Sequence, residues 1–374
     1  MTASLYVHLP FCARKCRYCD FESYAGRTDR ADEYIDRVLT EADICRREYG
    51  AFRVPTAYFG GGTPSILTSA QLERLICGLF ERFAPENDAE ITMEANPGTV
   101  DADKLHTLRR CGVNRISFGV QAAQNGILRT LGRIHTFEEA CRAAALARDA
   151  GFDNLNLDMM FALPGQTEDD LTQTAEAFAA LKPEHISCYS LILEPGTELE
   201  KWVSEGKAEL PDEDEACEMQ RLATRILTQK GYERYEISNF AAHGRECRHN
   251  LVYWQGGDYL GLGCAAHSFM QGERFANPGW EAYMGGSRAV DRERVDTTGR
   301  MEETLMLETR LIKGMDLSAF ERNFGRENAE KVRERARKLT GLVRVEDGFL
   351  RVTEEGLLLH NRIVLELVEA AENG

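Results

Sequence analysis

Three cysteines, Cys12, Cys16 and Cys19, are spaced CxxxCxxC near the start of the chain, directly after a short apolar segment at residues 5–8. Three thiolates can bind three irons of a cubane cluster, because thiolate is the usual ligand of such clusters. The fourth iron then has no cysteine ligand and can accept a small molecule through an amine and a carboxylate. The spacing therefore predicts a 4Fe-4S cluster with one open iron.

The main alternatives are a zinc site and three incidental cysteines. Structural zinc takes four ligands, usually as two pairs, and the sequence contains no second CxxC pair. Zinc would need His8 or a distant cysteine as its fourth ligand. Lys15 and Arg17 lie between the cysteines, where their charges would offset the negative charge of a cluster. The sequence therefore favours the cluster, and the methionyl end of S-adenosylmethionine has the groups that the open iron requires.

A glycine-rich segment, GGGTP at residues 60–64, directly follows a strand-like segment at residues 56–59. Successive glycines let the backbone approach a ligand closely and direct its amides and carbonyls toward it. On its own such a segment is more often only a tight turn. One strand away from the cysteine loop, it indicates contact with the amine of the methionyl group.

Single polar residues stand at or near the ends of later strand-like segments: Glu94, Gln121 and Asp158. A lone carboxylate at a strand end is more often a helix cap or the partner of a buried cation. Three such groups at equivalent places around one barrel are expected to converge on ribose hydroxyls and the amine. Arg133 can reach a carboxylate, although a surface arginine is the ordinary interpretation.

These residues fall on a repeated βα pattern. Periodicity predicts strands at residues 5–8, 56–59, 90–94, 115–120, 154–160 and 185–193, and helices at 31–49, 69–83, 102–111, 137–150 and 168–181. Thr28, Asp101 and Thr136 are candidate N-caps. Repeated βα units imply a parallel sheet with right-handed crossovers, and six of them suit a partial (β/α)6 TIM-like barrel. Its active face is expected at the carboxyl ends of the strands.

The rest of the chain is expected to close this barrel and add a second unit. An acidic helix at residues 211–230 and a strand at 235–240 complete the barrel, residues 1–240. Residues 241–300 form a linking segment. Residues 301–374 show the helix, helix, hairpin and helix order of a winged-helix-like domain. We interpret this domain as a packing or lid module, because DNA binding conflicts with the acidic charge.

Composition excludes several classes of protein. The formal charge is −16, from 45 basic and 61 acidic residues, which would repel a phosphate backbone, so nucleic acid is not expected as a partner. Neither a secretory signal nor a membrane-spanning run is apparent, and a cytoplasmic location is expected. Eleven cysteines, an odd number, do not suggest a disulfide framework. Cys45, Cys77, Cys111 and Cys141 are expected to be core residues.

With these motifs in view, the chain resembles the radical S-adenosylmethionine superfamily. The motifs are YVHLPF before CxxxCxxC, GGGTP, SFGVQ at 117–121 and LPGQT at 163–167. The resemblance covers essentially the whole chain and is strongest to the branch shared by oxygen-independent coproporphyrinogen III oxidases and HemW-type heme chaperones. It implies a radical SAM partial barrel with a helical, winged-helix-like C-terminal domain. It also implies that Cys12, Cys16 and Cys19 bind the cluster. The implied S-adenosylmethionine contacts are Tyr6, Tyr18, Gly61, Gly62, Thr63, Glu94, Gln121, Arg133 and Asp158, with Tyr18 stacked on the adenine.

Three features favour the chaperone side of this branch. Asp20 and Phe21 follow the third cysteine, whereas the oxidases have a fourth cysteine two residues after it. Only five residues precede Tyr6, whereas the oxidases carry an N-terminal extension. The segment at residues 248–254 matches the HNxxYW signature associated with heme in HemW proteins. By resemblance, His249, Tyr253 and Trp254 would then bind heme, an imidazole and two aromatic faces being chemically suitable.

Nearby residues are weaker heme candidates, and three functions stay open. His267 is a second choice as a heme ligand, and Cys247 is expected to pack. The preferred function is a heme chaperone that passes heme to an apo-hemoprotein acceptor, which can be membrane-associated, and receives electrons from a donor to its cluster. Such a protein need not turn over a substrate. The alternatives are a radical coproporphyrinogen III oxidase and a winged-helix DNA binder with an iron–sulfur sensor.

Overall fold

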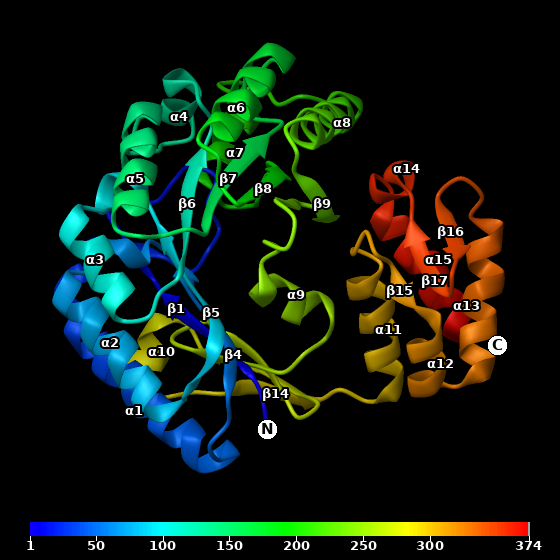
Figure 1. Ribbon diagram of the computed structural model, residues 1–374, viewed down its shortest axis with the longest axis horizontal. Coiled ribbons are helices and arrows are strands. Elements are labelled where there is room, and N and C mark those ends of the chain that lie inside the picture. Colours follow the sequence, from blue (N-terminus) through cyan, green and yellow to red (C-terminus); the bar gives the residue numbers. More distant parts are fainter. Residues whose placement is uncertain (373–374) are drawn as a thin grey trace.

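The computed structural model describes residues 1–372 as two units with separate hydrophobic cores (Figure 1). The larger core contains residues from Ala3 to Tyr283. The smaller contains residues from Met301 to Ala371. The two units meet along α9 (Arg248–Trp254) and α11 (Thr297–Glu308), and the chain passes from the first unit to the second directly before α11.

Six parallel strands form the centre of the larger unit. They are β1 (Ser4–Leu9), β4 (Val54–Gly61), β5 (Pro85–Ala95), β6 (Arg115–Gln121), β7 (Leu155–Phe161) and β8 (His185–Ser190). They pair in chain order and in parallel. The six predicted strands and their parallel arrangement are therefore confirmed. β8 ends at Ser190 instead of residue 193, and β5 begins five residues earlier than predicted.

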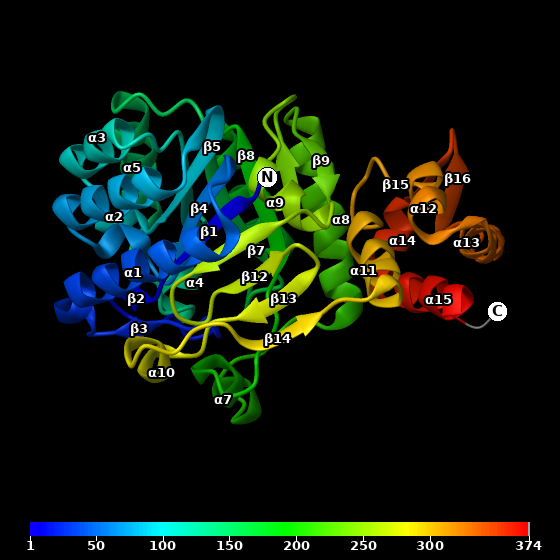
Figure 2. The same ribbon diagram turned by 90° about the horizontal axis from the view of Figure 1, so that it is seen from below.

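Further strands extend this sheet on both sides to twelve strands, in the order β14-β13-β12-β11-β1-β4-β5-β6-β7-β8-β10-β9. On one side lie β11 (Tyr259–Leu262), β12 (His267–Met270), β13 (Glu273–Ala276) and β14 (Val290–Arg294) (Figure 2). β11 pairs with β1, so much of the 241–300 segment belongs to the barrel sheet. The two ends of the sheet do not pair, which makes the barrel partial.

The other edge of the sheet corrects one expectation. Residues 235–240 are not a single strand but the antiparallel pair β9 (Glu233–Glu236) and β10 (Asn239–Ala241). The chain turns at Ile237 and Ser238 because the carboxylate of Glu236 accepts the backbone N–H of Ser238 at 2.8 Å. A buried carboxylate that binds its own backbone in this way stabilises the turn over continued strand.

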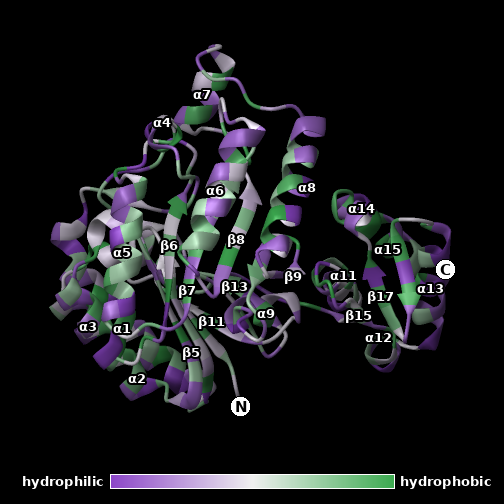
Figure 3. Ribbon diagram, turned by 45° about the horizontal axis from the view of Figure 1, so that its top comes forward, coloured by the Kyte–Doolittle hydropathy of each residue, from purple (hydrophilic) through white to green (hydrophobic). Residues whose placement is uncertain are grey.

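Helices cover the outside of the strands. The predicted helices are confirmed as α1 (Ala31–Tyr49), α2 (Ser69–Arg82), α3 (Ala102–Arg110), α5 (Phe137–Asp149) and α6 (Glu168–Ala180), and α8 (Glu213–Gln229) is the acidic helix. Figure 3 shows hydrophobic and hydrophilic residues alternating along α8, as a helix with one buried face requires. Short helices α4 (Asn125–Thr130), α7 (Glu198–Ser204) and α10 (Trp280–Met284) lie in the connections. Across the described chain, no helix is long and apolar enough to cross a membrane.

Two of the three predicted N-caps are confirmed. The side chains of Asp101 and Thr136 accept backbone N–H groups at the starts of α3 and α5. Thr28 is wrong as a cap, because it begins a short 3-10 turn (Thr28–Arg30) that runs directly into α1. The cap position of α1 is Arg30, whose side chain makes no capping hydrogen bond.

The C-terminal unit has the predicted winged-helix-like order. It contains α11 (Thr297–Glu308), β15 (Met315–Asp316), α12 (Leu317–Phe324), α13 (Arg326–Lys338), β16 (Val343–Glu346), β17 (Phe349–Val352), α14 (Glu354–Leu357) and α15 (His360–Glu372). β16 and β17 form the hairpin, and β15 pairs with β17. Arg310 joins this unit to the barrel through an ion pair of 3.2 Å with the buried Glu236.

Candidate functional site

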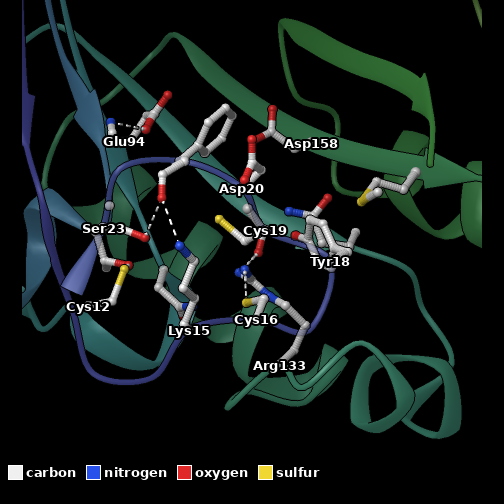
Figure 4. A pocket seen from close by; sticks show the side chains of 18 of the residues that line it. Cys12, Lys15, Cys16, Tyr18, Cys19, Asp20, Ser23, Glu94, Arg133 and Asp158 are labelled. Carbon is white, nitrogen blue, oxygen red and sulfur yellow. Dashed lines mark hydrogen bonds between the residues drawn. The ribbon is translucent and has the colours of Figure 1, made fainter. Parts of the chain in front are cut away.

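The cysteine loop is closed at its base by the two-residue strands β2 (Phe11–Cys12) and β3 (Tyr24–Ala25), which pair in parallel. All three thiols of the CxxxCxxC motif line one cavity at the carboxyl ends of the barrel strands (Figure 4). Cys12 is buried, and its sulfur lies 3.6 Å from the hydroxyl of Thr63. Burial raises the pKa of the Cys12 and Cys19 thiols. A bound metal would lower it again.

This cavity has a volume of about 380 Å³ and collects side chains from five strand ends. Eight of the nine residues expected to contact S-adenosylmethionine line it: Tyr18, Gly61, Gly62, Thr63, Glu94, Gln121, Arg133 and Asp158. They come from positions up to 140 residues apart in the chain. The parallel sheet brings them together because its strands all end at the same face.

Tyr6 does not line the cavity. Its hydroxyl lies 3.0 Å from Nδ1 of His8, and its ring stacks on Tyr58 with centroids 6.3 Å apart. Tyr6 and Tyr58 are paired in register on β1 and β4, inside the barrel and below the strand ends. The expected direct contact between Tyr6 and the ligand is therefore not supported by its position.

The glycine loop is held tightly against the base of the cysteine loop. Gly62 donates its N–H to the carbonyl of Leu9 at 2.9 Å, and Thr63 donates to that of Phe11 at 2.7 Å. Gly61 has φ +108°, and a Cβ there would lie 2.5 Å from the ring of His8. The glycines therefore let the 60–64 loop pack directly against the backbone at the base of the cysteine loop, and these two segments shape the cavity.

We predict that Gly62→Ala destabilises the protein and lowers cluster retention. The added Cβ would lie 2.7 Å from the carbonyl oxygen and 2.9 Å from the nitrogen of Phe11, and neither backbone atom can move without displacing Cys12. Overpacking of this kind costs about 1–3 kcal/mol. Thermal unfolding and iron content measure the two effects. Gly126→Ala is the control, because its Cβ would meet only the end of Arg129 at 4.0 Å. Equal behaviour of the two variants would contradict the prediction.

Two half-buried carboxyl groups, Glu94 and Asp158, form the acidic side of the cavity. Glu94 accepts hydrogen bonds from the hydroxyl of Tyr58 at 2.8 Å and from the N–H of Gly61 at 3.1 Å. Burial, and the nearby charge of Asp158, raise the pKa of Glu94 to about 7. Asp158 accepts from Nδ2 of Asn156 at 2.7 Å, and burial raises its pKa as well. Each can receive an ammonium or hydroxyl donor.

Arg133 supplies the opposite charge. One Nη donates to the sulfur of Cys16 at 3.3 Å, and the other donates to the carbonyl of Gly119. Its buried Nε has no hydrogen-bond partner among the described residues. A guanidinium that lines a cavity suits a ligand carboxylate. Gln121 lies beside Arg133, since both side chains pack against Gly119. It has φ +76°, in a strand irregularity that ends β6, and strained backbone of this kind collects at binding sites.

The donor set fits a multi-iron cluster more closely than a single ion. Within residues 1–372, no three His, Cys, Asp or Glu side chains converge as ligands of one metal ion. Ligands of a cubane cluster bind separate irons and need not converge on one point. Three thiols, two carboxyl groups with raised pKa values and one guanidinium line the same cavity. Together they fit a cluster whose ligand carries an amine and a carboxylate.

Sequence reasoning missed several residues that line the cavity. These are Asn96, Thr99, Ser117, Tyr189 and Ile192, among others. Ser117 could have been found, because it lies two and four residues before Gly119 and Gln121 on one strand and therefore shares their face. Tyr189 stands at the end of β8, the same position that singled out Glu94. Ile192 is 67% exposed and lies in a connection that carries no periodic signal.

The segment expected to bind heme forms the short helix α9 (Arg248–Trp254), away from the cavity. His249 is only 1% exposed. Its Nδ1 lies 2.7 Å from the hydroxyl of Thr56, and its Nε2 lies 2.9 Å from that of Tyr253. Burial lowers the pKa of His249 to about 3. Both ring nitrogens are therefore engaged, and ligation of iron by His249 requires one of these hydrogen bonds to break.

The remaining predicted residues divide between surface and core. The guanidinium of Arg310 stacks over the ring of Trp254, with its Cζ atom 4.4 Å from the ring centroid. His267 is exposed at the start of β12. Cys247 is buried and close to Glu90, which confirms that it packs.

Four further cysteines were expected in the core. Cys45 and Cys111 are buried, as expected, and Cys141 is half-buried. Cys77 is exposed, so its assignment to the core is wrong. It lies on α2, outside the four buried positions that face the sheet.

Comparison with known proteins agrees with this geometry. Residues 6–178 match the model of the Radical SAM superfamily, and residues 295–359 match that of the HemN C-terminal domain. The heme chaperone HemW of Bacillus subtilis is 34% identical, with 96% of this chain and 97% of that protein covered. HemW of Escherichia coli is 42% identical over 71% of this chain and 69% of its own. The structure of coproporphyrinogen III oxidase (HemN) from Escherichia coli superposes with a TM-score of 0.84 and 26% identity, covering 98% of this chain and 89% of its own.

The partial barrel, the cysteine loop and the C-terminal unit define a protein of the radical S-adenosylmethionine class. Relatives of more than 30% identity over nearly the full length narrow this class further. The chain belongs to the HemW family of heme chaperones.

Proposed function

We propose that this protein binds heme and transfers it to an apo-hemoprotein, and that it carries a 4Fe-4S cluster with S-adenosylmethionine on the open iron. The observation that carries the proposal is the relationship to HemW proteins along almost the whole chain. The three thiols at the cavity support the cluster. We propose an electron donor to the cluster as a further partner. The proposed location is the cytoplasm.

The residues around the cavity divide the binding of S-adenosylmethionine among them. When bound, the cluster and S-adenosylmethionine would supply one-electron chemistry. Cys12, Cys16 and Cys19 would hold the cluster. Arg133 would orient a carboxylate of the ligand, and the carboxyl group of Glu94 would receive the ammonium. Further contacts fall to Tyr18, Gly61, Gly62, Thr63, Gln121 and Asp158.

Heme would be held by α9. His249, Tyr253 and Trp254 are the proposed residues. Because His249 is buried against Thr56 and Trp254 packs against Arg310, α9 has to separate from Thr56 or from the C-terminal unit first. The C-terminal unit contacts the barrel beside this helix and would act as a cover. DNA binding is not proposed for it, because the chain carries a formal charge of −16.

We predict that His249→Ala weakens heme binding while the absorption of the cluster stays intact. The variant removes the one imidazole on α9, whereas the cluster ligands lie on a separate loop. Heme titration followed by absorption measures the first effect, and the visible spectrum of the reconstituted cluster measures the second. His106→Ala is the control, since His106 is exposed on α3 and lies outside both proposed sites. Unchanged heme affinity in His249→Ala would remove His249 from the site.

A radical coproporphyrinogen III oxidase is the alternative, favoured by the structural match to HemN. A chaperone has to bind and release heme, whereas the oxidase has to convert coproporphyrinogen III. We predict that the reconstituted protein binds heme stoichiometrically, passes it to an apo-hemoprotein, and does not convert coproporphyrinogen III under anaerobic reducing conditions. Formation of protoporphyrinogen at enzymatic rates would overturn the chaperone proposal in favour of the oxidase.

A further inference from the structure

Helix α9 touches the cavity indirectly, through one tyrosine of the barrel interior. The ring of His249 stacks on that of Tyr58, with centroids 5.1 Å apart and planes inclined by 25°. The hydroxyl of Tyr58 donates to the carboxylate of Glu94 at 2.8 Å. The other oxygen of that carboxylate accepts the N–H of Gly61. His249 thus lies behind Tyr58, and Tyr58 lies behind a carboxyl group that lines the cavity.

His249 is itself held firmly in place. Its two ring nitrogens bind Thr56 and Tyr253. The carboxylate of Glu90 accepts the backbone N–H groups of Arg248 and His249, at 3.1 and 3.0 Å. Thr56 stands two residues before Tyr58 on β4, so the helix is attached to the same strand that it supports. The imidazole is therefore held in one position and supports the ring of Tyr58 by stacking on it.

We propose that α9 has a role at the S-adenosylmethionine site: His249 is a positioning residue that acts through Tyr58 on the carboxylate of Glu94. This inference rests on the proposed function, because it takes the cavity to bind S-adenosylmethionine. It gives the HNxxYW segment a task that does not involve heme. It also means that any movement of α9 changes the support of Glu94.

The environment of Glu94 shows why one hydroxyl matters. Tyr58 and the N–H of Gly61 are its hydrogen-bond donors. Asp158 adds a negative charge from β7, Tyr6 faces it from β1, and Arg115 adds a positive charge from β6. A donor to the ionised form lowers the pKa of a carboxyl group. Loss of the Tyr58 hydroxyl should therefore keep Glu94 protonated to higher pH and weaken binding of the ligand ammonium.

Tyr58→Phe tests this step, because it keeps the ring and removes only the donor. Binding of S-adenosylmethionine to the cluster-loaded protein is measured by calorimetry across pH. We expect the pH midpoint of affinity to rise by about one unit and the affinity at neutral pH to fall about fivefold, since a one-unit shift cuts the ionised fraction by that order. Tyr232→Phe is the matched control: it also loses a buried hydroxyl hydrogen bond of 2.8 Å, to the carbonyl of Pro183, far from Glu94.

His249 variants test the second step. His249→Ala removes the ring face behind Tyr58 and should reproduce the higher pH midpoint, while His249→Phe restores a ring face and should recover part of the shift. If His249→Ala does not fold, Tyr58→Phe and His249→Phe still decide the matter. A pH midpoint unchanged in either Tyr58→Phe or His249→Ala, with normal binding by the wild type, would overturn the inference. No binding by the cluster-loaded wild type would instead overturn the proposed function.

Discussion

Replacing Cys19 with serine is expected to abolish the iron–sulfur cluster and, with it, the binding of S-adenosylmethionine. A serine hydroxyl is a much poorer iron ligand than a thiolate, since clusters of this kind are held by cysteine thiolates. Cys19 and its two neighbours in the motif are the cysteines that line the cavity. No further cysteine among the lining residues is available to replace it.

The measurement is iron and sulfide content with the visible charge-transfer absorption, after anaerobic reconstitution. Cys141→Ser is the matched control, because Cys141 is also half-buried but lies on α5, outside the cavity. We expect the control to keep the full cluster and normal binding of S-adenosylmethionine. Full cluster content in Cys19→Ser would show that the three thiols do not form the site.

The positions of the strands and helices could be predicted because their patterns are local. Apolar periodicity placed α1 at its observed bounds, and the side chains of Asp101 and Thr136 are typical cap residues with helix directly after them. Thr28 has the same residue type, but a turn of 3-10 helix follows it. A 3-10 turn can thus lie between a candidate cap residue and its α-helix. The residue type alone does not reveal whether it does.

The convergence of the cavity residues could be predicted from topology, but which side chains reach the cavity could not. Tyr6 stands three residues before the end of β1, and Asp158 stands equally far before the end of β7, yet of these two only Asp158 lines the cavity. The ring of Tyr6 instead stacks on that of Tyr58, and its hydroxyl lies 3.0 Å from Nδ1 of His8. Distance from the strand end therefore does not decide the contact, because neighbouring side chains of the folded barrel do.

The enclosure of His249 also lay beyond sequence reasoning. A helix of seven residues has too few turns for its pattern to show which face is covered. Its cover comes from Thr56 and Tyr58, nearly two hundred residues earlier, and from Arg310 of the C-terminal unit. Such long-range contacts depend on how the chain returns to the barrel between β10 and β11, which local sequence patterns do not reveal.

Affinity for S-adenosylmethionine is expected to rise about tenfold between about pH 6 and about pH 8, as Glu94 ionises. The pKa of this carboxyl group is raised to about 7, with burial as the main cause. Below that pH it is neutral and cannot pair with the ligand ammonium; above it the carboxylate is present and binding is strong. Binding near neutral pH should therefore release a proton, which calorimetry in buffers of different ionisation enthalpy detects.

Glu94→Gln should remove both the pH dependence and the proton release, and hold the affinity at or below the low-pH value of the wild type. The amide keeps the size of the side chain: its oxygen can accept the N–H of Gly61 while its NH2 donates to the hydroxyl oxygen of Tyr58, so the fold around the cavity should persist. The same raised pKa has an opposite effect on the unliganded fold: because the unfolded carboxyl group ionises near 4.5, this residue lowers stability as pH rises from there to about 7. Glu94→Gln should therefore flatten the pH profile of thermal stability in that range while weakening the ligand at high pH. A variant that kept the wild-type pH dependence of binding would assign the titration to another group, of which Asp158 is the nearest carboxyl in the cavity.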